Sequence, residues 1–138
     1  MRHLGLITVL VADYDEAIAY YAEVLGFELR SDLPVHERGK PNKRWVVMAP
    51  GPDAQTGLLL ARAEGERQKA RVGDQTGGRV GFFLYTDDFA ADHSRLKKAG
   101  ATFEQEPRDE PYGRVAVLRD PYGNRWDLIE PASGKRPA

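Results

Sequence analysis

Histidine and cysteine, two of the side chains that most often carry acid–base or metal chemistry, are few or absent in this chain. The chain has three histidines and no cysteine. His3 precedes the first strand-like run, His36 lies in a loop rich in proline and glycine, and His93 lies on an expected helix. The lack of cysteine excludes thiol nucleophiles, cysteine-ligated zinc and iron–sulfur clusters. Neither a Ser-His-Asp arrangement nor a phosphate-binding loop is indicated.

The acidic residue Asp127 lies inside a strand-like run at 125–129. Aspartate is uncommon in strands, and a buried carboxylate is costly unless it is paired. Two interpretations are open. Asp127 either pairs with a nearby arginine or lies exposed at a sheet edge, or it orients a ligand or acts as a general base with a shifted pKa. Arg44, beside Trp45, also has two interpretations: it is a surface arginine, or it binds an anionic ligand.

Composition limits the classes of partner. Lys and Arg total 20 against 21 Asp and Glu, a balance that gives no electrostatic support for binding nucleic acid. The first residues do not follow the pattern of a secretory signal, and no apolar run approaches the roughly 18 residues that span a bilayer. We therefore expect a cytoplasmic protein that binds neither nucleic acid nor membrane.

The first half of the chain predicts one strand, one helix and three further strands. Asp13, followed three residues later by Glu16, has the spacing of a helix N-cap, and Gly26 ends the helix as a C-cap glycine does. Apolar side chains recur at helical intervals between them. The expected strands are 6–11, 27–29, 44–48 and 57–61.

The second half repeats this order after a charged connector at 62–78. Asp88 takes the place of the N-cap and Gly100 the place of the C-cap, and the expected strands are 80–86, 101–103, 114–118 and 125–129. A repeat indicates that neither half has enough core to be stable alone. The sequence predicts an α+β fold in which two βαβββ modules form a cupped mixed sheet around a central cavity.

Four stretches carry a resemblance to a known family. They are 11–21, 24–27, 107–113 and 120–124, which includes the turn Asp120-Pro121-Tyr122-Gly123-Asn124. In this order they resemble the vicinal oxygen chelate superfamily of glyoxalases, bleomycin resistance proteins and extradiol dioxygenases, over residues 6–130. The resemblance implies a single domain at 1–138, with module one at 4–61, the connector at 62–78 and module two at 79–131. It also implies a homodimer.

The resemblance also implies where metal ligands would lie. Metal-dependent members use four side chains, usually His, Glu or Gln, and the matching positions here are Leu6, Leu59, Gly81 and Asp127. Leucine and glycine side chains offer no lone pair, and one carboxylate cannot hold a divalent transition metal in competition with water. We therefore predict no metal site and no cofactor.

Alternation along the strands then predicts which side chains face the cavity. The set includes Leu6, Thr8 and Leu10 on one strand, and Gly81, Phe83, Tyr85, Asp127 and Ile129 on two others. Two further strands add either Trp45 or Val46, and either Val115 or Val117, to the cavity-facing set, because their register cannot be fixed from the sequence. Tyr112 lies in a loop that could cover the opening. The predicted ligand-binding residues are Thr8, Trp45, Phe83, Tyr85, Tyr112 and Asp127.

Three functions follow from this cavity. The first is a small-molecule binding protein of the glyoxalase/bleomycin-resistance type that lacks the usual metal ligands. The second is a metal-independent isomerase or lyase in which Asp127 is catalytic. The third is a metalloenzyme of the glyoxalase or dioxygenase type with a non-standard site. The sequence leaves open whether the chain is an enzyme.

Overall fold

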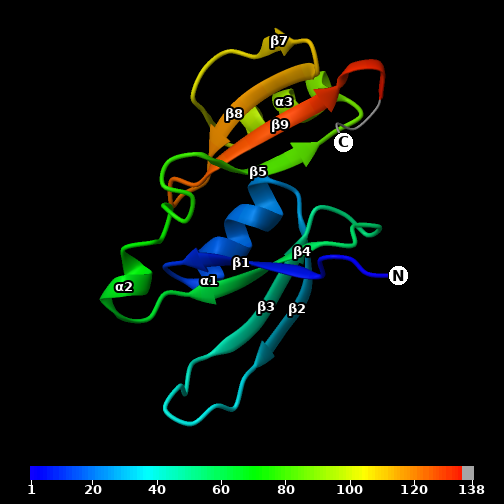
Figure 1. Ribbon diagram of the computed structural model, residues 1–138. Helices are drawn as coiled ribbons and strands as arrows, with labels where there is room; N and C mark the ends of the chain where they lie inside the picture. The colour runs from blue at the N-terminus through cyan, green and yellow to red at the C-terminus, as the bar shows by residue number, and fades with distance from the viewer. Residues whose placement is uncertain (135–138) are drawn as a thin grey trace. The chain divides into compact units, whose positions relative to one another are not determined.

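The structure is a computed structural model that describes residues 1–134 (Figure 1). The chain divides into two compact units, Met1–Gly73 and Asp74–Ala138, here called unit 1 and unit 2. The boundary between them lies inside the expected connector 62–78. Each unit holds one mixed sheet, of four strands in unit 1 and five in unit 2, so the predicted α+β class is confirmed. The grouping of both units into one domain stays a prediction.

Unit 1 has the order strand, helix, strand, strand, strand. Its elements are β1 (Leu6–Val11), α1 (Tyr14–Ala19) continued by the π-helix η1 (Tyr20–Val24), β2 (Glu28–Pro34), β3 (Arg44–Ala49), β4 (Gly57–Arg62) and the short helix α2 (Gly65–Lys69). The strands pair in the order β1-β4-β3-β2, with β1 parallel to β4 and the other pairs antiparallel.

Local chemistry explains where α1 begins and where its π-helical continuation ends. The Asp13 carboxylate accepts a hydrogen bond from the Glu16 amide at 2.8 Å, which satisfies one of the amides that a helix start leaves without a partner. At the other end Gly26 has φ of +75°, a conformation that glycine adopts without a Cβ clash. Both predicted ends are thus confirmed.

One face of the unit 1 sheet packs against α1 and forms the core of the unit. Val9 and Val11 of β1, Val46 of β3 and Leu60 of β4 are fully buried, and Val46 pairs directly with Leu60. Thr8 lies on the opposite face, because side chains alternate along a strand.

Strand β2 is longer than the predicted strand at 27–29. It continues to Pro34, and its register with β3 shifts between Leu29 and Ser31. The bulge frees Arg30, whose guanidinium donates to the backbone oxygens of Gly51, Pro52 and Ala54 at 2.7–3.2 Å. A bulge of this kind breaks the apolar alternation that reveals a strand in sequence.

Unit 2 repeats the order of unit 1 with one additional strand. Its elements are β5 (Val80–Tyr85), α3 (Phe89–Lys98), β6 (Thr102–Phe103), β7 (Arg108–Glu110), β8 (Gly113–Arg119), β9 (Arg125–Pro131) and the 3-10 turn η2 (Ala132–Gly134). The order is β5-β9-β8-β6, and β7 also pairs with β8. Asp88 caps α3 by accepting from the Ala91 amide at 3.1 Å. No helix within residues 1–134 is long and apolar enough to cross a membrane.

Strand β7 lies in the stretch 107–113, which the sequence analysis placed in a loop with Tyr112. The pairing is antiparallel, with Arg108 opposite Val115 and Glu110 opposite Gly113. Three consecutive charged residues carry no apolar alternation, so the strand has no signal in the hydrophobic pattern. The correction matters for the site, because β7 places Arg108 beside the face that carries Asp127.

The β8–β9 turn is organised by one buried carboxylate, that of Asp120. One oxygen accepts from the amides of Tyr122 and Asn124, both at 3.0 Å. The other accepts from the Asn124 side-chain amide at 2.8 Å and from the Trp126 indole at 3.3 Å. Trp126 is 3% exposed and stacks on Phe82 with ring centroids 4.4 Å apart. The turn is therefore tied directly to the unit 2 core.

Replacement of Asp120 by alanine should destabilise the protein by about 3 kcal/mol, because buried donors lose a charged acceptor. Urea unfolding followed by circular dichroism measures this change. The control is Asp109→Ala, since the Asp109 side chain is 88% exposed and its removal should cost well under 1 kcal/mol. Equal effects of the two variants would contradict the role assigned to Asp120.

Candidate functional site

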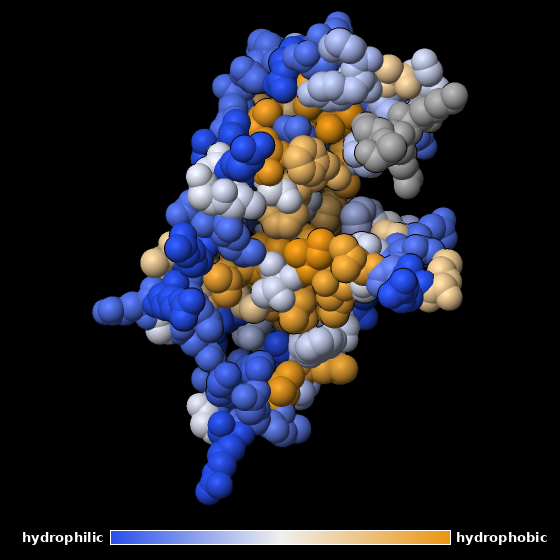
Figure 2. Space-filling model, viewed as in Figure 1, coloured by the Kyte–Doolittle hydropathy of each residue, from blue (hydrophilic) through white to orange (hydrophobic). Residues whose placement is uncertain are grey.

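The sheet face of unit 2 that points away from α3 is apolar and aromatic. The register places Phe83 beside Asp127 and Tyr85 beside Ile129, and Val117 pairs with Asp127 from the other side. Phe83 is 55% exposed and Tyr85 is 38% exposed, although large apolar side chains are usually buried. Figure 2 shows apolar side chains gathered over β8 and β9 of this unit.

Asp127 lies at the middle of this face and is 7% exposed. Its Oδ1 atom is buried and has no hydrogen-bond partner within residues 1–134. Buried polar atoms are nearly always hydrogen-bonded, so an exception calls for a physical reason. One such reason is that Oδ1 accepts its hydrogen bond from a ligand.

Burial raises the pKa of the Asp127 carboxyl above its ordinary value. The positive charges of Arg108 and Arg125 act in the opposite direction and oppose the rise, while the nearby charge of Glu104 adds to it. Desolvation is the largest effect, as expected for a carboxyl without a bonded cation. The carboxyl is thus easier to protonate than a solvated aspartate.

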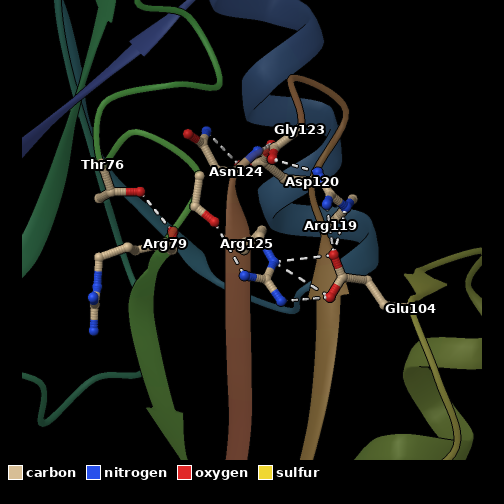
Figure 3. A network of polar contacts seen from close by, with 9 residues as sticks. Thr76, Arg79, Glu104, Arg119, Asp120, Gly123, Asn124 and Arg125 are labelled. Atoms are coloured by element: carbon tan, nitrogen blue, oxygen red, sulfur yellow. Dashed lines mark hydrogen bonds and ion pairs between the residues drawn. The ribbon is translucent and has the colours of Figure 1, made fainter.

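The two arginines near Asp127 are held by other partners. Arg125 contacts both oxygens of Glu104, at 2.8–3.3 Å, and donates to the Gly78 carbonyl. Arg119 binds the same glutamate at 2.7 Å, as Figure 3 shows. Arg108 pairs with Glu110 at 2.9 Å. These pairs hold the guanidinium groups near Asp127 without neutralising it.

The structure contradicts the interpretation of Asp127 as an ion-paired or edge residue. Strand β9 lies between β5 and β8, so Asp127 is not at a sheet edge. Within residues 1–134 Asp127 forms no ion pair, and its Oδ1 has no partner. The alternative interpretation, a ligand-orienting group or general base, stays a prediction.

The predicted residue Tyr112 lies in the turn between β7 and β8. Its side chain is exposed, and its carbonyl accepts from the Ala132 amide at 2.8 Å. The pKa of Arg108 is raised first by its bond to Glu110 and then by a hydrogen bond to Tyr112. Tyr112 therefore lies next to a group that acts on Asp127, and its role as a cover stays a prediction.

The predicted residues Thr8 and Trp45 belong to unit 1. The register pairs Thr8 with Leu59 and Leu59 with Val47, so Trp45 rather than Val46 shares the open face of the sheet. Thr8, Trp45 and Leu59 line a cavity of about 240 Å³ within this unit. Trp45 is 42% exposed. In Figure 2 apolar side chains also gather over β1 and β4.

Two other residues singled out in the sequence, Arg44 and His93, already have contacts within their own unit. Arg44 binds the Asp32 carboxylate at 2.7 Å and Asp15 at 3.0 Å, so it is an ion-paired residue and not an open clamp. His93 lies between Phe89 and Phe103, with ring centroids 5.5 and 4.4 Å away. Burial lowers the pKa of the His93 imidazole, and Lys97 lowers it further.

Comparison with known proteins identifies the family. The model of the Glyoxalase/Bleomycin resistance protein/Dioxygenase superfamily matches residues 3–128. This chain belongs to that superfamily. The resemblance seen in the sequence is thus confirmed.

Several proteins are similar to this chain, among them two of known structure. UcmS2 is 32% identical with a TM-score of 0.79, and the match covers 94% of this chain and 98% of that one. TnmS3, described as an antibiotic binding protein from Streptomyces sp. CB03234, is 32% identical with a TM-score of 0.75, over 96% and 98%. An uncharacterized protein of Shewanella frigidimarina (strain NCIMB 400) is 45% identical over 90% of each chain.

The superfamily's metal positions do not fit a metal in this chain. Leu6 and Leu59 have no donor atom, and neither has Gly81. A Cβ added at Gly81 would lie 3.0 Å from the Thr76 methyl carbon, so a ligating side chain there would displace Thr76. Within residues 1–134 no group of three His, Cys, Asp or Glu residues could hold a metal ion. Asp127 is the one position of the four with a donor side chain.

Sequence reasoning missed Arg108 and Arg62. Arg108 lies in a strand with no hydrophobic pattern, and its influence on Asp127 depends on pairing with β8. Arg62, at the end of β4, lines the unit 1 cavity, but the sequence assigned it to the connector. The one sequence signal that could have singled out Arg62 is its position as a charged residue directly after the apolar strand 57–61.

Replacement of Asp127 by asparagine should stabilise the protein by about 1 kcal/mol at pH 7, because it removes a desolvated charge. A carboxyl whose pKa is higher in the folded state loses stability as the pH rises from its unfolded value through the raised one. The gain should therefore fade as the pH is lowered below that window. Urea unfolding at several pH values measures it, with Asp109→Asn as control. A loss of stability at pH 7 would show that Asp127 is paired after all.

Proposed function

We propose that this protein binds a small apolar or aromatic molecule without a metal and holds it without chemical change. The observation that carries the proposal is the buried Oδ1 atom of Asp127, which has no hydrogen-bond partner within residues 1–134 and lies between exposed Phe83 and the apolar Val117. Binding sites for small molecules are mostly apolar, with a few polar groups that fix orientation. The predicted ligand-contacting residues are Phe83, Tyr85, Tyr112 and Asp127 in unit 2, and Thr8 and Trp45 in unit 1.

The preferred ligand of the Asp127 face should carry a hydrogen-bond donor or a positive charge. The Oδ1 atom can only accept while the carboxyl is ionised, and a charge-assisted hydrogen bond is roughly twice as strong as a neutral one. The rings of Phe83 and Tyr85 attract cations through their electron-rich faces. The antibiotic-binding description of TnmS3 supports a binding role of this kind. The homodimer and the cytoplasmic location stay predictions.

A matched series of 2-naphthamidine, 2-naphthamide and 2-naphthoate tests the preference, because the three differ mainly in charge. We expect the cation, 2-naphthamidine, to bind most tightly. Binding is measured by the quenching of tryptophan fluorescence. Asp127→Asn should weaken its binding about tenfold, the worth of one charge-assisted bond, and Phe83→Ala should weaken all compounds that bind this face. Asp109→Asn, on the other face of the same sheet, is the control. No quenching by this series or by a wider panel of planar compounds would refute the proposal.

Metal independence is a separate expectation. The superfamily positions Leu6, Leu59 and Gly81 supply no ligand, so EDTA should leave binding unchanged. Elemental analysis of the purified protein should find less than about a tenth of an equivalent of divalent transition metal, since metal affinity depends on ligand number and type. A stoichiometric metal that EDTA removes together with binding would replace this proposal by the metalloenzyme alternative.

The raised pKa of Asp127 favours one second candidate, a metal-independent isomerase or lyase. A carboxylate with a raised pKa is a stronger base than a solvated aspartate, which favours proton abstraction. The two functions differ in turnover. Product formed by the wild type and abolished in a folded Asp127→Asn variant would establish the enzyme, whereas unchanged ligand recovered from the complex supports simple binding.

A further inference from the structure

The unit 1 cavity is surrounded by cations. It lies where the ends of β3 and β4 meet the loop 35–43 and the start of α2. Lys40, Lys43, Arg44 and Arg62 line it, together with one carboxylate, Glu64. The neighbouring aromatic rings are those of Trp45 and Tyr14. The arrangement combines apolar surface with positive charge.

Three of the four cations are already neutralised. Lys43 binds Glu37 at 2.6 Å, and Lys40 lies 3.4 Å from Glu37 and 3.7 Å from Glu64. The Asp32 and Asp15 carboxylates hold Arg44 in the same way. These three side chains are therefore positioned by carboxylates, and their charges do not by themselves demand a ligand.

Arg62 differs from them. Its guanidinium carbon lies 5.4 Å from the centroid of the Tyr14 ring, and within residues 1–134 it has no carboxylate partner. The side chain is half-buried at the end of β4. Tyr14 is itself fixed, because it is buried and its hydroxyl accepts from the Arg44 amide at 3.2 Å. A fixed aromatic ring thus holds an unneutralised cation against the cavity.

Comparison of the two repeated units shows that Arg62 in unit 1 has no cation at the equivalent position in unit 2. Arg44 lies over Tyr14 at 5.0 Å, and its counterpart in unit 2, Arg114, lies over Phe89 at 5.1 Å. The strand pairings place Arg62 at the position of Glu130. In unit 2 the Glu130 carboxylate accepts from the Phe89 amide at 2.9 Å. Unit 1 therefore has a cation without a partner where unit 2 has an acceptor with one.

We propose that the unit 1 cavity binds a small aromatic anion, a carboxylate on a single ring, with Arg62 pairing the anionic group and Trp45 contacting the ring. A guanidinium matches the two oxygens of a carboxylate. A cavity of about 240 Å³ is below the roughly 300–1,000 Å³ typical of drug-sized ligands, which favours one ring. One unpaired cation favours one negative charge over a polyphosphate. The inference deepens the proposed function and rests on it for the premise that this protein binds small molecules.

The test uses benzoate, benzamide and benzamidine at pH 7, with binding measured by calorimetry and located by amide chemical-shift changes in the labelled full chain. We expect benzoate to bind best and to shift the amides of Thr8, Trp45 and Arg62. Arg62→Gln should weaken benzoate binding about tenfold, the worth of a hydrogen bond to a charged group. Arg62→Lys, which keeps the charge, should retain most of the benzoate affinity. This variant also provides the test if Arg62→Gln does not fold.

Two variants make the outcomes distinguishable. Arg67→Gln removes a cation from the exposed helix α2 outside the cavity and should leave benzoate binding unchanged. Asp109→Asn, which removes an 88% exposed carboxylate in unit 2, should also leave it unchanged. Binding of benzamidine or benzamide that matches benzoate, or an Arg62→Gln variant as tight as wild type, would overturn the inference and leave the proposed function standing. Benzoate binding through Arg62, without any effect of Asp127 or Phe83 on other ligands, would support the inference and remove the Asp127 site. Absence of binding by these three compounds alone would overturn the inference, and absence of binding by the naphthyl series and the wider panel as well would overturn both.

Discussion

The hydrogen bonds accepted by the Asp120 carboxylate set the register on which the unit 2 face depends. They close the turn between β8 and β9 and anchor it to the buried indole of Trp126. Once Trp126 points into the core, alternation directs Asp127 to the opposite face. A slip of one residue would bury Trp126's neighbours in its place and move the carboxylate to the helix side. The candidate site thus follows from a structural carboxylate seven residues earlier in the chain.

Asp120 and Asp127 are both buried, and the contrast between them supports a functional interpretation of the second. Asp120 has a donor for each of its oxygens, whereas the Oδ1 atom of Asp127 finds no partner in the described part of the chain. An unsatisfied buried polar group costs about 1–3 kcal/mol. A fold that can satisfy one aspartate fully has no structural need to leave the other incomplete. The deficit is consistent with a partner that arrives from outside the chain.

The sequence allowed the helix ends and the strand faces to be predicted, because caps and alternation depend on neighbouring residues. Asp13, Gly26 and the parity of Phe83 with Asp127 are of this kind. Features that depend on distant pairing were not predictable. Arg108 needs its pairing with β8, and sequence alone could not show that Trp126 is core while Trp45 is 42% exposed. The same limit applies to Arg44, whose role was decided by Asp32 and Asp15.

The repeat also bears on the proposed binding role without a metal. The superfamily's four metal positions are divided between the two modules, and here only Asp127 retains a donor. Within residues 1–134 each unit carries its own polar group. In unit 2 the Asp127 Oδ1 atom has no hydrogen-bond partner, and in unit 1 Arg62 has no carboxylate partner. In the two proposals above, the carboxylate of unit 2 and the guanidinium of unit 1 each recognise a ligand group of opposite character.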